Sequence, residues 1–115
     1  MGISMSRIRA AALVMIVAAA WPAARAETVH PGQALASARQ CLGCHQVDAR
    51  RVGPPFTAIA ARFAGQPGAR DYLAEVIRKG STGQWGAIPM PAQPRVSETD
   101  ARVLAAWILS LGAER

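Results

Sequence analysis

Apolar residues recur along residues 31–112 with the three- and four-residue spacing of amphipathic helices, and clusters of Gly and Pro separate these stretches. No stretch alternates apolar and polar residues as a half-buried strand would. The pattern predicts four helices, at about Pro31–Cys41, Phe56–Phe63, Arg70–Lys79, and from an N-cap at Ser97 to a stop at Gly112. The chain is therefore predicted to have an all-α fold.

Each predicted helix carries an apolar stripe that would face a common core. In chain order, the stripes are Ala34, Leu35, Ala38 and Cys41; Phe56, Ile59, Ala60 and Phe63; Tyr72, Leu73, Val76 and Ile77; and Val103, Leu104, Trp107, Ile108 and Leu111. The last two helices are separated by a long loop, residues 81–96, that is rich in Gly and Pro. A loop of this length in so short a chain usually has a function.

The N-terminal residues 1–26 do not belong to this pattern. Two arginines precede an unbroken apolar run, Ala10–Ala20, and residues 24–26 form an A-x-A cleavage site. The run is shorter than the roughly twenty residues that a transmembrane helix needs. We therefore expect a secretory signal peptide that is cleaved after Ala26, leaving one domain at residues 27–115. The alternative is an uncleaved N-terminal anchor.

Composition narrows the class of protein further. Three of the thirteen basic residues and none of the seven acidic ones lie in the predicted signal peptide, so cleavage would reduce the net charge from +6 to +3. The remaining basic residues are scattered along the chain and not clustered with aromatic residues, which argues against nucleic-acid binding. A domain this short has a marginal core, which a buried cofactor would enlarge.

The clearest chemical motif is Cys41-Leu42-Gly43-Cys44-His45, a C-x-x-C-H run. This run is the attachment signature of c-type haem: two thiols bond the porphyrin vinyl groups, and the adjacent imidazole becomes the proximal iron ligand. A zinc site is disfavoured, because the second His of the chain, His30, lies at no usual finger spacing. A thioredoxin-like dithiol would follow a strand, which the sequence lacks. A structural disulfide beside an unrelated His stays open.

A second iron ligand is predicted in the long loop. Met90 is the only Met after the predicted cleavage site, and it lies between Pro89 and Pro91. A rigid loop can hold a thioether on iron, where it favours the ferrous state. Met90 could instead fill the core. His30, the competing imidazole, lies close to the new N-terminus, where we expect an exposed residue.

The mature chain resembles a small class I cytochrome c of the c-551/c-552 group of bacterial periplasms, also called cytochrome c8. The resemblance is carried by Cys41–His45, Val52-Gly53-Pro54, Phe63-Ala64-Gly65-Gln66, Gly80-Ser81, Trp85–Pro91 and Leu104–Leu111. It implies about four helices wrapped around one covalently bound haem.

The resemblance also implies roles for single residues. The Pro54 carbonyl would accept a hydrogen bond from His45, and the Trp85 indole would donate one to a haem propionate. Trp107 would pack between the first and last helices. The implied haem site thus consists of Cys41, Cys44, His45, Pro54, Trp85 and Met90, with His45 and Met90 on the iron.

Three positions depart from this group. Ala36 stands where the group often has an aromatic residue, and Val76 stands where it often has a basic residue near a propionate. Gln93 occupies a position from which a polar side chain often hydrogen-bonds the Met ligand. We expect a looser or differently compensated first helix and an altered pH dependence of the reduction potential.

Iron with both axial positions occupied favours electron transfer over catalysis. We therefore expect a periplasmic one-electron carrier, not an enzyme. It would dock transiently on a reductase, oxidase or dehydrogenase through a haem edge framed by Leu42, Gly43 and residues 88–92, with no nucleic acid and no stable membrane insertion. The alternatives are a haem c subunit of a periplasmic dehydrogenase and, with Met90 off the iron, a ligand-binding or peroxidase-like protein.

Overall fold

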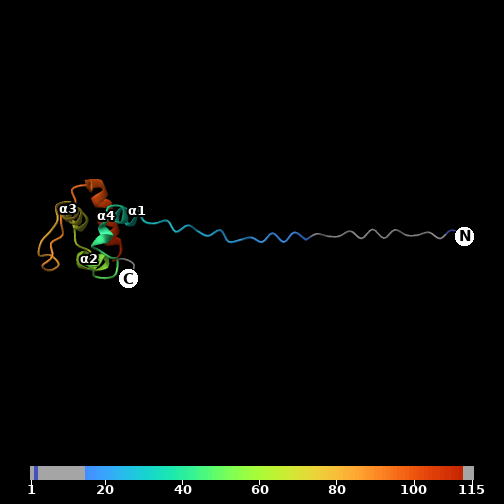
Figure 1. The fold of residues 1–115 in the computed structure, drawn as a ribbon, viewed down its shortest axis with the longest axis horizontal. Helices are drawn as coiled ribbons and strands as arrows, with labels where there is room; N and C mark the ends of the chain where they lie inside the picture. Colours follow the sequence, from blue (N-terminus) through green and yellow to red (C-terminus); the bar gives the residue numbers. More distant parts are fainter. Residues whose placement is uncertain (1, 3–14, 113–115) are drawn as a thin grey trace.

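The computed structural model describes residue 2 and residues 15–112 and folds the chain into helices joined by loops (Figure 1). The helices are α1 (Pro31–Ala38), α2 (Phe56–Phe63), α3 (Ala69–Lys79) and α4 (Glu98–Ser110), with a 3₁₀ turn, η1 (Cys41–Gly43), after α1. The described residues contain no strand, and their only β-pairing is an isolated bridge between Ser81 and Met90. The predicted all-α class with four α-helices is confirmed.

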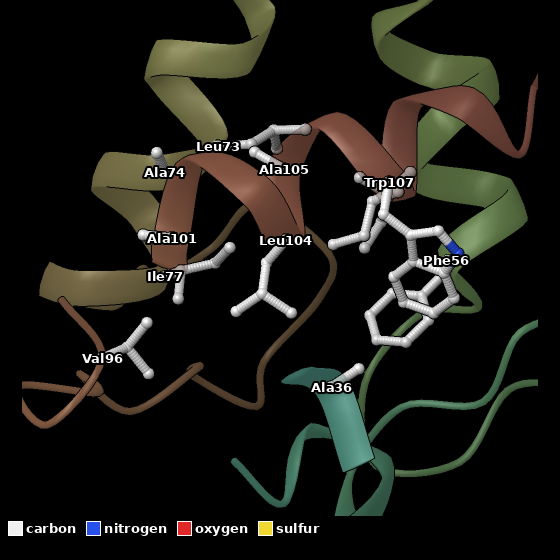
Figure 2. Packing of buried hydrophobic residues seen from close by; sticks show 12 residues of the cluster. Ala36, Phe56, Leu73, Ala74, Ile77, Val96, Ala101, Leu104, Ala105 and Trp107 are labelled. Carbon is white, nitrogen blue, oxygen red and sulfur yellow. The ribbon is translucent and has the colours of Figure 1, made fainter. Parts of the chain in front are cut away.

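Helix α4 lies at the centre of the fold and packs against α1, α2 and α3. Its Leu104 is almost completely buried, and Trp107 meets Phe56 of α2 edge to face, with ring centroids 5.2 Å apart (Figure 2). The buried cluster around these side chains consists of Ala36, Phe56, Ile59, Leu73, Ala74, Ile77, Val96, Ala101, Leu104, Ala105, Trp107 and Ile108. The predicted stripes of the second, third and fourth helices therefore supply most of the core.

The end of the first helix differs from the prediction. Helix α1 ends at Ala38, three residues before the expected end at Cys41. Gln40 has a φ of 61°, in the left-handed region that a right-handed helix does not contain. Cys41 therefore begins the separate turn η1 and is not the last residue of the helix.

The predicted apolar face of α1 is only partly right, because Leu35 and Cys41 pack against the core but Ala34 and Ala38 do not. Gly32 and Ala36 are the buried residues, whereas Ala34 and Ala38 are exposed. A methyl group at Gly32 would overlap Cβ of Trp107 and lie 2.8 Å from its Cγ, so the backbone of α1 lies directly against this side chain. The close crossing of α1 and α4 requires small residues. The periodicity of apolar side chains does not reveal this face, because its residues are buried on account of their small side chains and not their hydrophobicity.

Polar caps define the starts of α1 and α4. His30 is the N-cap of α1, where its Nδ1 accepts a hydrogen bond from the Gly32 N–H at 3.0 Å. His30 is exposed as expected, but sequence reasoning missed this capping role. The Ser97 hydroxyl accepts from the Asp100 N–H at 3.0 Å, as its predicted N-cap position requires. The Asp100 carboxylate pairs with Arg39 at 3.2 Å and so links α4 to the end of α1.

Residues 15–29 form an exposed segment without helix or strand that extends away from the helices (Figure 1). Arg7, Arg9 and residues 10–14 of the apolar run of the predicted signal peptide lie outside the described residues. In the part of the chain that the structure describes, no helix is long and apolar enough to cross a membrane. Cleavage after Ala26 stays a prediction.

The crossing of α1 and α4 can be tested with Gly32→Ala. This change should lower the free energy of unfolding by about 1–3 kcal/mol, because the added methyl group forces α1 away from Trp107. The control Ala34→Ser adds one heavy atom on the exposed side of the same helix and should cost less than about 0.5 kcal/mol. Denaturant unfolding followed by circular dichroism measures both. Equal stabilities of the two variants would contradict the close crossing.

Candidate functional site

A mainly apolar cleft lies between α2, α3 and the loop at residues 81–96. It consists of two adjoining hollows of about 810 and 760 Å³, open solvent included. The residues that line both hollows are Cys44, His45, Ile59, Leu73, Val76, Met90 and Pro91. Pro54 and Trp85 line the first hollow, and Cys41 lines the second. The fold thus brings all six predicted site residues to one cleft.

The two cysteines and His45 lie on one tight turn. The Cys41 carbonyl accepts from the N–H groups of Cys44, at 3.1 Å, and His45, at 2.9 Å. Cys41 is half-buried and Cys44 is exposed, and neither forms a disulfide. Burial raises the pKa of the Cys41 thiol above its usual range, against an opposing backbone hydrogen bond, and the neighbouring Cys44 adds to the rise. Both sulfurs are therefore free to bond a group in the cleft.

The His45 imidazole is fixed by a hydrogen bond to the chain that follows the motif. Its Nδ1 lies 2.8 Å from the carbonyl oxygen of Pro54, and the side chain is buried. A carbonyl only accepts, so Nδ1 carries the proton and donates. Nε2 is then the unprotonated nitrogen, which is the form that binds a metal. This contact is the one that the resemblance implied for Pro54.

Packing holds the same imidazole ring in place. A methyl group at Gly53 would lie 2.5 Å from Cε1 of His45, so the Gly53 backbone lies against the ring. Phe56 stacks on His45 with centroids 5.0 Å apart and planes at 18°, and Phe56 in turn meets Trp107. The imidazole is therefore the end of an aromatic series that begins at the crossing of α1 and α4, where Trp107 contacts Gly32.

Met90 is held by the C-terminal end of α3. It exchanges two backbone hydrogen bonds with Ser81, of 3.0 and 2.9 Å. Gly80, the C-cap of α3, has a φ of 77°, and a methyl group there would lie 2.5 Å from the Met90 carbonyl oxygen. The Gln93 N–H donates to the Ile77 carbonyl at 3.1 Å, just after Met90. The loop therefore meets the end of α3 at Met90 and again at Gln93.

The remaining candidates lie as follows. Val76 lines both hollows, and the Gln93 side chain lines the second, where its amide donates to the Pro91 carbonyl at 3.3 Å. His30 lines a separate hollow beside Trp107 and is not brought to the cleft. Sequence reasoning did not foresee the packing of Gly53 and Phe56 on His45. It placed Phe56 in the core by periodicity and gave no reason for a Gly at position 53.

The cleft suits a flat, largely apolar group that bonds two thiols and a metal ligand. Aliphatic side chains of α2, α3 and α4 line it, namely Ile59, Leu73, Val76, Ile77, Leu104 and Ile108. The two thiols and the free Nε2 of His45 lie along one segment of its wall. The donor set and the lining therefore fit a haem.

Residues 29–112 match the protein family described as cytochrome c. The chain belongs to this family. It is 50% identical over 80 residues to the cytochrome c-551 of Stutzerimonas stutzeri, across 70% of this chain and 76% of that protein. It is 46% identical over 77 residues to the cytochrome c-552 of Hydrogenobacter thermophilus, across 67% and 78% of the two chains. The crystal structure of wild-type Nitrosomonas europaea cytochrome c552 shares the fold, with a TM-score of 0.67 and 49% identity across 68% of this chain and 96% of that chain.

These matches confirm the resemblance to the c-551/c-552 group of class I c-type cytochromes. As a member of the cytochrome c family with an intact C-x-x-C-H motif, the protein carries one covalently bound haem c, attached through Cys41 and Cys44 next to His45.

The contact between Gly53 and His45 predicts the effect of Gly53→Ala. The new methyl group would displace the imidazole from Pro54, and the displacement should lower the free energy of unfolding of the holoprotein by about 1–3 kcal/mol. Asp48→Ala, an exposed change in the same segment, is the control and should leave stability within about 0.5 kcal/mol of wild type. Chemical unfolding monitored by haem absorbance compares the variants. An imidazole packed elsewhere would leave Gly53→Ala as stable as the control.

The junction of α3 and the Met90 loop has two glycines with positive φ. Gly80 and Gly83 have φ values of 77° and 73°, but only Gly80 contacts neighbouring backbone. Gly83→Ala should cost about 1–2 kcal/mol from the left-handed conformation alone. Gly80→Ala should cost about 1–3 kcal/mol more, because its methyl group also meets the Met90 carbonyl and because its ψ of 179° lies outside the left-handed well. Thermal unfolding of both variants gives the difference, and equal losses would show that the contact is absent.

Proposed function

We propose that this protein is an exported one-electron carrier whose haem iron is bound by His45 and Met90. The observation that supports this proposal is the placement of both side chains along the same cleft, with Nδ1 of His45 committed to Pro54. The two residues come from separate segments, His45 from the turn after α1 and Met90 from the loop after α3. Each is anchored by its own backbone contacts.

The haem supplies a single-electron ferric/ferrous couple, and the chain tunes this couple. Hydrogen bonding of Nδ1 to Pro54 raises the basicity of the other imidazole nitrogen. The soft thioether of Met90 favours the ferrous state and so raises the reduction potential. With both side chains on the iron, no coordination position is left for a substrate. This arrangement favours a carrier over an enzyme.

The mouth of the cleft supplies a surface for docking. Leu42, Val52 and Ile88 are 37%, 46% and 63% exposed, although each is a large apolar residue near the haem motif or the Met90 loop. Val52 and Ile88 also line the first hollow. A small apolar surface of this kind suits the transient encounters of redox proteins. The partner would be a periplasmic reductase, oxidase or dehydrogenase.

Export belongs to the same proposal. Residues 1–26 would direct the chain to the periplasm and be removed after Ala26. The mature domain would then be residues 27–115, without stable membrane insertion. In this domain, Trp85 would donate its indole N–H to a haem propionate from its position in the first hollow.

Optical spectra of the purified holoprotein test the proposed ligands. The ferric wild type should show a far-red Met–iron charge-transfer band and bind cyanide slowly. Met90→Ala should lose the band, bind cyanide quickly and have a lower reduction potential, because the thioether no longer stabilises ferrous iron. A wild-type protein without the band and with fast cyanide binding would contradict the carrier proposal and favour a ligand-binding haem protein. Elution as part of a larger complex would instead favour a dehydrogenase subunit.

A further inference from the structure

The middle of the Met90 loop has few connections to the rest of the fold. At its ends, Ser81, just after α3, pairs with Met90, and Gln93 bonds to Ile77 of α3. Within the described residues, residues 82–89 make no backbone–backbone hydrogen bond to any other segment. Among the described residues, their one hydrogen bond to the rest of the fold comes from the side chain of Arg62, on the last turn of α2.

Arg62 makes two contacts with neighbouring residues of the loop. Its Nη1 donates to the Gln84 carbonyl at 2.6 Å, and its Cζ lies 4.6 Å from the centre of the Trp85 ring. The first is a charge-assisted hydrogen bond, and the second has the geometry of a cation–π contact. A planar guanidinium can make both at once, which a lysine ammonium does less well.

Trp85 links this contact to the cleft. The ring is half-buried, packs against the core cluster and lines the hollow that Met90 and His45 also line. Trp85 lies five residues before Met90, and Gly86 between them has a φ of 115°, which few other residues adopt. Gly86 therefore turns the backbone between the ring that contacts Arg62 of α2 and the methionine that is held next to the end of α3.

We propose that Arg62 is a positioning residue that clamps Trp85 and the middle of the loop to α2 and thereby keeps Met90 in the cleft. Arg62 is exposed and does not line either hollow, so it acts through the loop. Without these contacts, residues 82–89 would move away from α2, and the pairing of Ser81 with Met90 would be the remaining restraint on this stretch. The role of Met90 as an iron ligand rests on the proposed function, whereas the clamp itself does not.

Arg62→Gln removes both contacts and tests the clamp. Amide hydrogen exchange of a peptide covering residues 82–90 should become about three- to tenfold faster, because the loop loses its hydrogen bond and its cation–π contact. Displacement of the Met90 sulfur from ferric iron by added imidazole should accelerate by a similar factor. Exchange in α1 and α4 should stay at the wild-type rate.

Two matched variants separate the clamp from charge and from general stability. Arg78→Gln removes the same charge from an exposed arginine of α3 that makes no ion pair within the described residues, and it should leave both rates unchanged. Arg62→Lys keeps the charge but not the planar fork, so its rates should lie closer to those of Arg62→Gln. Wild-type rates in Arg62→Lys would overturn the clamp, as would equal rates in Arg62→Gln and Arg78→Gln.

The two measurements also keep this inference apart from the proposed function. Loop exchange that rises in Arg62→Gln supports the clamp whichever group binds the iron. A far-red band in the wild type together with unchanged loop exchange in Arg62→Gln would overturn the clamp and leave the carrier proposal intact. Absence of the band in the wild type would overturn Met90 ligation alone.

Discussion

The hydrogen bond from Nδ1 of His45 to the Pro54 carbonyl is the interaction on which the site depends. It selects the tautomer that leaves Nε2 for iron, and it ties the haem motif to the chain that enters α2. The backbone of Gly53 and the ring of Phe56 then determine where the imidazole lies. Because Phe56 contacts Trp107, the position of one iron ligand is coupled to the helix packing of the whole domain.

The other side of the cleft is built on a different principle. Met90 comes from a loop that is closed by its pairing with Ser81, joined to α3 by the bond from Gln93 to Ile77, and bonded in its middle to Arg62 of α2. A closely packed imidazole and a methionine on a sparsely bonded loop therefore line the same cleft. The haem, held covalently on the rigid side, also supplies apolar surface that so short a chain cannot provide for itself.

Much of the fold could be predicted because its elements follow local rules. Helix α2 has the predicted bounds, α3 ends at the predicted Gly80, and Ser97 caps α4. Helix α1 could not be predicted as well, since its end depends on the left-handed Gln40 and its buried face on a close crossing with α4. Neither feature produces a periodic pattern of apolar residues. In the sequence alone, a small residue that is buried at a helix crossing cannot be distinguished from a small residue on the surface.

For the site, the sequence by itself determined the chemistry: a C-x-x-C-H run specifies covalent haem attachment, and a single methionine between prolines nominates a second ligand. The motif can be recognised from five consecutive residues, because its two thiols must reach one edge of the same porphyrin. The tertiary structure alone decided how these groups are held. The stacking of Phe56 on His45, the approach of Gly80 to Met90 and the reach of Arg62 to Trp85 join residues that lie 10 to 23 positions apart in the chain. Contacts at such separations depend on how helices pack, and packing leaves no local pattern in the sequence.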